Sequence, residues 1–180
     1  PKGKIIIAGH SMGGGVALNY AMQKNKTKID GYILFAPLLG HNSPAIQQTP
    51  PTEADSTEPF MKIHFARIIG LKMLNETGNH SNDSLPVLFF NLPENFPTRK
   101  YTYRANMSMA PEDYKKALRS VYEPMLVLIG NKDEVFNAEA MKKAVTENSQ
   151  AVIRIIEGTT HNGIRNNPQA FEFIKKWFST

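Results

Sequence analysis

The stretch Lys4-Ile-Ile-Ile-Ala-Gly-His-Ser-Met-Gly-Gly-Gly-Val-Ala-Leu18 decides how the rest of the chain is interpreted. Its first half, residues 5–8, is a short run of mostly β-branched residues, typical of a strand buried on both faces of a parallel sheet. Residues 16–22 have the composition of a helix. Between them, residues 9–13 form a G-x-S-x-G pattern, so a strand-to-helix turn that carries a serine is predicted here.

We expect this turn to hold Ser11 in a strained backbone conformation, with its hydroxyl exposed above the sheet. Gly9 and Gly13 flank the turn, where a side chain is expected to clash with neighbouring backbone. Ser11 also lies at the positive end of the following helix, which favours negative charge on a bound oxygen. These features favour a nucleophilic serine, and the alternative is a glycine-rich turn whose serine is structural.

The Gly-His-Ser-Met-Gly-Gly segment at residues 9–14 resembles the nucleophile elbow of the α/β-hydrolase family. It has the form seen in the lysophospholipase-like, esterase and monoacylglycerol lipase-like branches of that family. The resemblance implies an α/β fold with a mostly parallel sheet and helices on both faces. Several strands and helices precede the elbow in this family, so residues 1–180 are expected to be the C-terminal part of one such domain, without its N-terminal strands.

Composition excludes several other classes of protein. Hydrophobic residues make up 41% and charged residues 21% of the chain, as in ordinary globular proteins. The net charge of +5 comes from scattered lysines and arginines without a basic stripe, so no nucleic-acid partner is expected. No apolar run is long enough for stable membrane insertion. The absence of cysteine excludes disulfides, zinc–thiolate sites and a cysteine nucleophile.

Strands and helices alternate along most of the chain. Further core strands are predicted at residues 29–36, 124–130 and 151–156, and helices at 111–121, at 137–147 with Asn137 as N-cap, and from Asn167 onward. This alternation predicts a parallel sheet covered by helices on both faces.

Residues 38–110 interrupt this alternation with recurrent prolines, which indicates an inserted substructure. Within it, residues 60–74 have apolar side chains at a helical period, and residues 87–92 are predicted to be a strand or a buried extended segment. A lid or cap occupies this place in α/β-hydrolases, so we expect a lid-like insertion. Its methionines and phenylalanines either pack locally or line an acyl-chain pocket.

A catalytic serine needs a base to take its proton, and the base needs a third group to orient it. In α/β sheets such groups follow the carboxyl ends of strands. Asp133 follows the predicted strand 124–130, in a segment that resembles the acid loop of the α/β-hydrolase family. Glu134 is the nearest alternative acid, and it lies one residue away from the pattern.

His161 follows the predicted strand 151–156, in a segment that resembles the histidine loop of the same family. The resemblance implies that His161 is general base towards Ser11 and then general acid towards the leaving group, while Asp133 orients the imidazole. We expect His10, which precedes the serine, to point to the other side of the turn and to have no role in proton transfer.

The backbone N–H of Met12 is the expected first donor of the oxyanion hole, and the second donor normally comes from a loop before the elbow. The prediction is a serine hydrolase that cleaves carboxylic esters, such as acyl glycerols, lysophospholipids or other small-molecule and lipid esters. It would act through an acyl-serine intermediate with no metal or organic cofactor. The alternatives are a peptidase or acyltransferase with the same triad, or a non-catalytic binding protein that keeps the fold.

The run at residues 5–7 has the pattern of a central strand, yet only one neighbouring strand, near residues 32–35, is evident. Its other edge would expose unpaired backbone groups. We therefore expect that edge to be covered by an upstream part of the same domain or by an oligomer partner.

Overall fold

The computed structural model describes residues 3–47, 61–96 and 98–179. The chain divides into two compact units, one formed by Pro1–Pro50 with Met109–Thr180 and the other by Pro51–Ser108. The second unit falls within the 38–110 range expected to hold an insertion, whereas residues 38–50 and 109–110 belong to the first unit.

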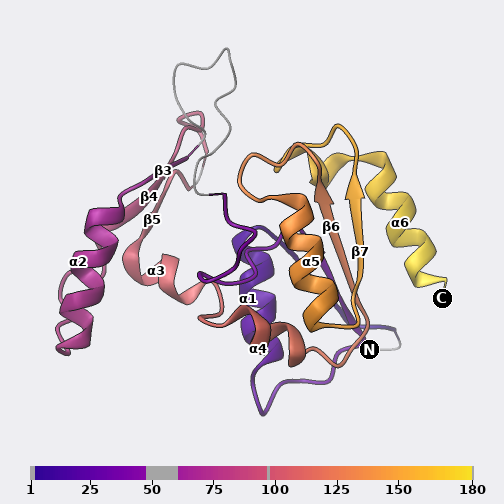
Figure 1. The fold of residues 1–180 in the computed structure, drawn as a ribbon, viewed down its shortest axis with the longest axis horizontal. Helices are drawn as coiled ribbons and strands as arrows, with labels where there is room; N and C mark the ends of the chain where they lie inside the picture. The colour runs from indigo at the N-terminus through magenta and orange to yellow at the C-terminus, as the bar shows by residue number, and fades with distance from the viewer. Residues whose placement is uncertain (1–2, 48–60, 97, 180) are drawn as a thin grey trace. The chain divides into compact units, whose positions relative to one another are not determined.

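The first unit is built on a four-stranded sheet in the order β1-β2-β6-β7. Figure 1 labels β6 and β7 of this sheet. All three pairs of neighbouring strands are parallel, as the alternation of strands and helices predicts. The strands are β1 (Ile6–His10), β2 (Gly31–Phe35), β6 (Met125–Gly130) and β7 (Val152–Ile156). Every residue of β6 is buried, because this central strand is covered on both faces of the sheet.

Helices cover both faces of this sheet. The helices α1, α4 and α5 lie on one face and α6 lies on the other (Figure 1). They comprise α1 (Met12–Ala21), α4 (Tyr114–Arg119), α5 (Ala138–Asn148) and α6 (Pro168–Phe178), with a 3₁₀ turn at Gly163–Asn166 before α6. The core lies between these layers, and Tyr32, Leu34, Leu126 and Leu128 are among its fully buried side chains.

Side-chain caps set where three of these helices begin. The expected cap at Asn137 is present, because its side chain accepts a hydrogen bond from the N–H of Ala140. Asn167 caps α6 in the same way. The helix predicted at 111–121 is shorter than expected, since Asp113 takes the N-cap position and accepts from the first free N–H groups.

The second unit contains a three-stranded antiparallel sheet, which the sequence did not predict. Its elements are β3 (Met61–Ile63), α2 (Phe65–Glu76), β4 (Pro86–Phe90), β5 (Lys100–Thr102) and α3 (Tyr103–Ser108). The segment 87–92, predicted to be a strand or an extended segment, supplies most of β4. The helix begins only at Phe65, because His64 caps it by accepting from the N–H of Arg67.

The strand β1 lies at the edge of the parallel sheet, because among the described strands it pairs only with β2. Ile6 and Ile7 are half-buried there, and Ile5 just before the strand is 38% exposed. That an upstream part of the domain or an oligomer partner covers the outer edge of β1 stays a prediction.

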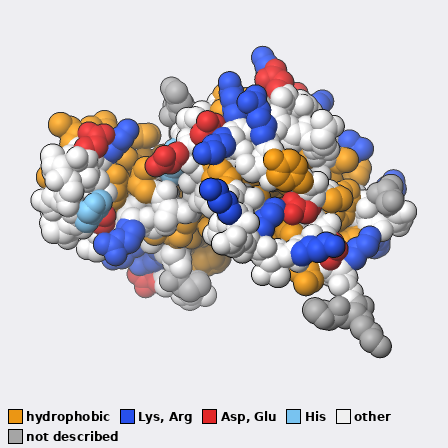
Figure 2. Space-filling model, turned by 90° about the horizontal axis from the view of Figure 1, so that it is seen from below, with side chains coloured by type: hydrophobic (Ala, Val, Ile, Leu, Met, Phe, Trp, Pro, Cys, Tyr) orange, Lys and Arg blue, Asp and Glu red, His pale blue; other side chains and the backbone are white. Residues whose placement is uncertain are grey.

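The surface mixes charges of both signs. On the face shown in Figure 2, acidic and basic side chains are interspersed rather than gathered in one stripe. None of the helices in the described ranges combines the length and apolar composition needed to cross a bilayer.

Candidate active site

Ser11 occupies the sharp turn between β1 and α1, in a strained conformation with φ 55° and ψ −120°. A non-glycine residue at positive φ costs about 1–3 kcal/mol and persists only where its surroundings hold it. Here the Ser11 N–H donates to the Phe35 carbonyl at 3.0 Å, and the Ser11 carbonyl accepts from the N–H of Leu38 at 2.8 Å. The Ser11 side chain does not cap α1, so the helix leaves its hydroxyl available.

The glycines around this turn differ in what they allow. A Cβ at Gly9 would lie 2.4 Å from the Gly13 carbonyl oxygen, so only glycine fits there, as expected. The expectation of a clash was wrong for Gly13, because α1 has already begun and a Cβ there would point into open space. Further tight contacts fall instead on Gly14, where a Cβ would lie 2.5 Å from the Cβ of Pro37, and on Gly15, where it would lie 2.3 Å from the Met109 carbonyl oxygen.

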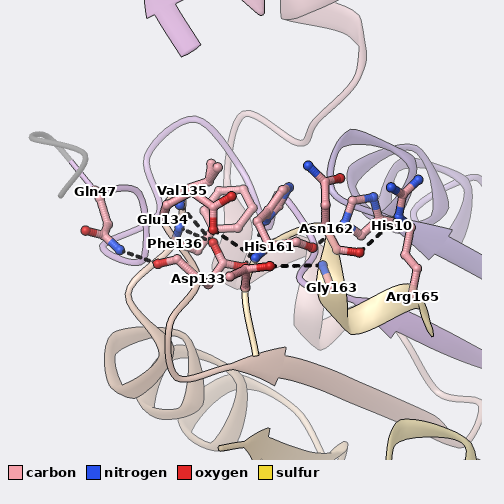
Figure 3. A network of polar contacts seen from close by, with 11 residues as sticks. His10, Gln47, Asp133, Glu134, Val135, Phe136, His161, Asn162, Gly163 and Arg165 are labelled. Carbon is pink, nitrogen blue, oxygen red and sulfur yellow. Dashed lines mark hydrogen bonds and ion pairs between the residues drawn. The ribbon is translucent and has the colours of Figure 1, made fainter. Parts of the chain in front are cut away.

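Asp133 follows β6 and is held by its own loop (Figure 3). Its Oδ1 accepts from the N–H groups of Val135 and Phe136, each at 2.8 Å. Its Oδ2 lies 2.8 Å from Nδ1 of His161. Gln47 donates to the Asp133 carbonyl at 2.8 Å. The bonds to Oδ1 and Oδ2 hold the buried carboxylate facing the imidazole and leave it little freedom to rotate.

His161 follows β7, and its imidazole is only 4% exposed. Because an ionised carboxylate only accepts hydrogen bonds, the Nδ1 that faces Asp133 carries the proton, and Nε2 is left with its lone pair. The ring lies between two aromatic rings, with centroid distances of 4.7 Å to His10 and 5.4 Å to Phe136. This arrangement gives a buried imidazole of one defined tautomer, which a general base requires.

The acid loop and the histidine loop pack against each other as one platform. The Gly158 N–H donates to Asn131 Oδ1 at 2.7 Å, and the Lys132 N–H donates to the Thr159 carbonyl at 3.1 Å. A Cβ at Gly130 would lie 1.8 Å from the Thr159 carbonyl oxygen, so this close approach requires glycine. The relative position of Asp133 and His161 is therefore set by backbone contacts as well as by their own hydrogen bond.

His10 lies beside His161, and the expectation that it points to the other side of the turn was wrong. Its Nε2 is 2.9 Å from the His161 carbonyl oxygen. Burial lowers the pKa of His10 from 6.5 to about 4, although the hydrogen bond to the backbone opposes this shift. The cause of the error is that the histidine loop crosses the carboxyl end of β1, which the sequence does not reveal.

Glu134, the alternative acid, contacts the backbone of His161 and not its ring. Its Oε2 accepts from the His161 N–H at 2.9 Å. The geometry therefore pairs the imidazole with Asp133. From the sequence, Glu134 was considered only as the alternative acid and His10 was expected to have no role in proton transfer. Their contacts with the His161 backbone were not predicted, and their adjacency to Asp133 and Ser11 was the one signal that pointed to them.

The residue before Ser11, His10, contacts His161 directly, and this contact places the Ser11 turn next to the histidine loop. Within the described residues no hydrogen bond joins the Ser11 hydroxyl to His161, although such contacts are often long when no substrate is bound. Met12 is the first residue of α1, so its N–H has no acceptor within the helix. The structure thus pairs Asp133 with His161 and places the Ser11 turn beside them.

The described residues contain no group of three or more histidine, aspartate or glutamate side chains arranged to hold a metal ion. The polar groups at the site instead form the hydrogen-bonded set described above, in which His161 lies between Asp133 and His10, the residue that precedes Ser11 (Figure 3).

The family model Hydrolase_4, described as serine aminopeptidase, S33, matches residues 1–168. Similar solved structures include a monoacylglycerol lipase from Paleococcus ferrophilus, with 20% identity and a TM-score of 0.58 over 96% of this chain and 66% of that chain. They also include Est1E from Butyrivibrio proteoclasticus, with 18% identity and a TM-score of 0.53 over 99% of this chain and 63% of that chain.

The esterase EaEST from Exiguobacterium antarcticum is similar as well, with 18% identity and a TM-score of 0.56 over 96% of this chain and 66% of that chain. No curated protein matches this chain significantly. The chain spans 63–66% of the length of these three structures, and the likeness to them establishes its fold.

Proposed function

This chain belongs to the Hydrolase_4 family of α/β-hydrolases, and we propose that it carries the catalytic triad of a serine hydrolase that cleaves carboxylic esters. One observation carries the proposal. It is the buried hydrogen bond between Asp133 Oδ2 and His161 Nδ1, at the carboxyl end of a parallel sheet and next to the strained Ser11 turn. An imidazole oriented by a carboxylate beside a half-buried serine is the arrangement that activates a hydroxyl for attack.

In the proposed reaction the Ser11 hydroxyl attacks the ester carbonyl while Nε2 of His161 takes its proton. Asp133 holds the resulting imidazolium, and the Met12 N–H at the start of α1 faces the oxyanion of the tetrahedral intermediate. His161 then returns the proton to the departing alcohol, which leaves an acyl-serine. Water, activated by the same imidazole, hydrolyses the acyl-serine and restores Ser11.

Acyl esters of glycerol or similar small-molecule and lipid esters are the proposed substrates. Support comes from the similar structures, which are named as a monoacylglycerol lipase and as esterases. We assign a lid role to the second unit. Its helix α2 exposes Phe65, Ile69 and Met73 at successive helical turns, an apolar stripe suited to contact with acyl chains.

Hydrolysis of peptides is the second candidate, because the family model is described as a serine aminopeptidase. The same triad serves ester and amide cleavage, so the substrate class has to be measured. Initial rates on p-nitrophenyl acyl esters and on aminoacyl p-nitroanilides separate the two. Faster turnover of the esters is expected, and efficient turnover of the anilides alone would favour the aminopeptidase.

A fluorophosphonate probe tests whether the site reacts at all, since it labels only an activated serine. We expect the protein containing this chain to be labelled at Ser11, and Ser11→Ala to lose both the label and the ester hydrolysis. Labelling that persists in Ser11→Ala would assign the nucleophile elsewhere. A folded, unlabelled protein would favour the non-catalytic binding protein.

A further inference from the structure

We propose that His10 and Glu134 are positioning residues that hold the main chain of His161 from both sides and so keep its imidazole against Asp133. This inference rests on the proposed role of His161 as general base. It assigns a task to two side chains outside the Ser–Asp–His set.

His161 is hydrogen-bonded at its backbone N–H, its carbonyl oxygen and Nδ1. Its N–H donates to Glu134 Oε2 at 2.9 Å, and its carbonyl oxygen lies 2.9 Å from Nε2 of His10. Its Nδ1 lies 2.8 Å from Asp133. Within the described residues Nε2 is the one polar atom of His161 without a hydrogen bond. It is also the atom that must accept the serine proton. The hydrogen bonds with Glu134, His10 and Asp133 therefore fix the other polar atoms of His161 and leave the reacting nitrogen free.

Glu134 and His10 bind the two peptide groups on either side of the His161 Cα. Rotation of either group moves the Cβ and therefore the ring. The two side chains come from different segments: His10 lies at the end of β1, and Glu134 lies in the loop after β6. The histidine loop is thus tied to both the serine segment and the acid segment. A displacement of about 1 Å at a catalytic group lowers the rate about 100-fold, so such ties affect turnover.

The charges of the His10 and Glu134 side chains suit these positions. Burial lowers the pKa of His10 to about 4, so its ring is neutral near pH 7 and its single N–H faces the carbonyl of His161. A neutral ring 4.7 Å from the His161 ring does not oppose the imidazolium that forms during catalysis. Glu134 places a carboxylate on the other side, where it makes a charge-assisted bond to the backbone N–H.

Two matched pairs of variants separate a hydrogen bond from mere packing. His10→Gln keeps a side-chain N–H donor, whereas His10→Phe keeps a ring without a donor. Glu134→Gln keeps an oxygen acceptor, whereas Glu134→Leu removes it. Asn137→Ala is the structural control, because it removes the hydrogen bond that caps α5 and removes no hydrogen bond to His161, Asp133 or Glu134.

Two measurements are made on the folded protein containing this chain. One is kcat and KM for a p-nitrophenyl ester, and the other is the far-downfield proton resonance of His161 Nδ1–H in its bond to Asp133. His10→Phe and Glu134→Leu are expected to lower kcat about 10- to 100-fold with little change in KM, and to broaden or shift the resonance. The two glutamine variants should retain both the kcat and the resonance of the wild type, and Asn137→Ala should lower only the melting temperature.

Unchanged kcat and an unchanged resonance in both His10→Phe and Glu134→Leu would overturn the proposal. So would a loss of activity no larger than that of Asn137→Ala at equal folded fraction. The resonance reports the ring position without turnover. A wild-type protein that shows the resonance but cleaves no ester therefore contradicts the proposed function, while the variants still decide the positioning.

Discussion

Replacing Asp133 by asparagine tests the acid of the proposed triad with the smallest change of shape. In the structure one carboxylate oxygen accepts from the N–H groups of Val135 and Phe136, and the other faces Nδ1 of His161. Asparagine has only one side-chain oxygen. The two backbone N–H groups retain that oxygen, so the amide NH₂ is turned towards the imidazole.

The consequence is a reversal of the tautomer of His161. An NH₂ group donates, so Nδ1 becomes the acceptor and the ring proton moves to Nε2, where it blocks removal of the serine proton. In other triads the same change lowers kcat about 10⁴-fold. At about 1.36 kcal/mol for each tenfold change, that corresponds to about 5.4 kcal/mol of transition-state stabilisation.

The assay is kcat for ester hydrolysis by Asp133→Asn, alongside thermal unfolding to verify that the protein is folded. The matched control is Glu134→Gln, the same acid-to-amide change one residue along, which keeps an acceptor for the His161 N–H. We expect it to stay within about 10-fold of wild type. Near-normal turnover of Asp133→Asn, or an equal loss in Glu134→Gln, would refute the assignment of the acid.

Three further predictions concern stability, and chemical denaturation measures each. Gly9→Ala should destabilise by about 1–3 kcal/mol or more, since its Cβ meets the Gly13 carbonyl, whereas Gly13→Ala should be neutral or stabilising by up to about 1 kcal/mol; similar losses in both would contradict this. Ser11→Gly should abolish turnover yet stabilise by about 1 kcal/mol by relieving the positive φ, and a less stable variant would show that the turn stores no strain. Burial lowers the pKa of His10 from 6.5 to about 4, so between these pH values the unfolded chain binds more protons than the folded protein. The contribution of neutral, buried His10 to stability is therefore complete above pH 6.5 and declines as the pH falls towards 4. His10→Gln should flatten that decline, and an unchanged pH profile would argue against a buried neutral ring.

Local sequence signals were sufficient for the main sheet and for the turn that carries Ser11. Apolar runs flanked by helical segments predicted the parallel strands, because burial on both faces permits only such runs. The G-x-S-x-G pattern predicted the turn at Ser11, because its backbone is strained and Gly9 faces backbone at close range. Asp133 and His161 were expected from their position directly after two of these strands and from the resemblance of their loops to those of the family. The structure joins their side chains by a hydrogen bond, and their catalytic roles stay a proposal.

The surroundings of His161 were decided only by the tertiary structure. Whether His10 faces the histidine loop depends on where that loop crosses the sheet, and the loop is about 150 residues away in the sequence. The bond from the His161 N–H to Glu134 likewise exists only once two loops are packed together. The antiparallel sheet of the second unit was missed for the same reason, since its short strands acquire a pairing partner only through long-range contacts.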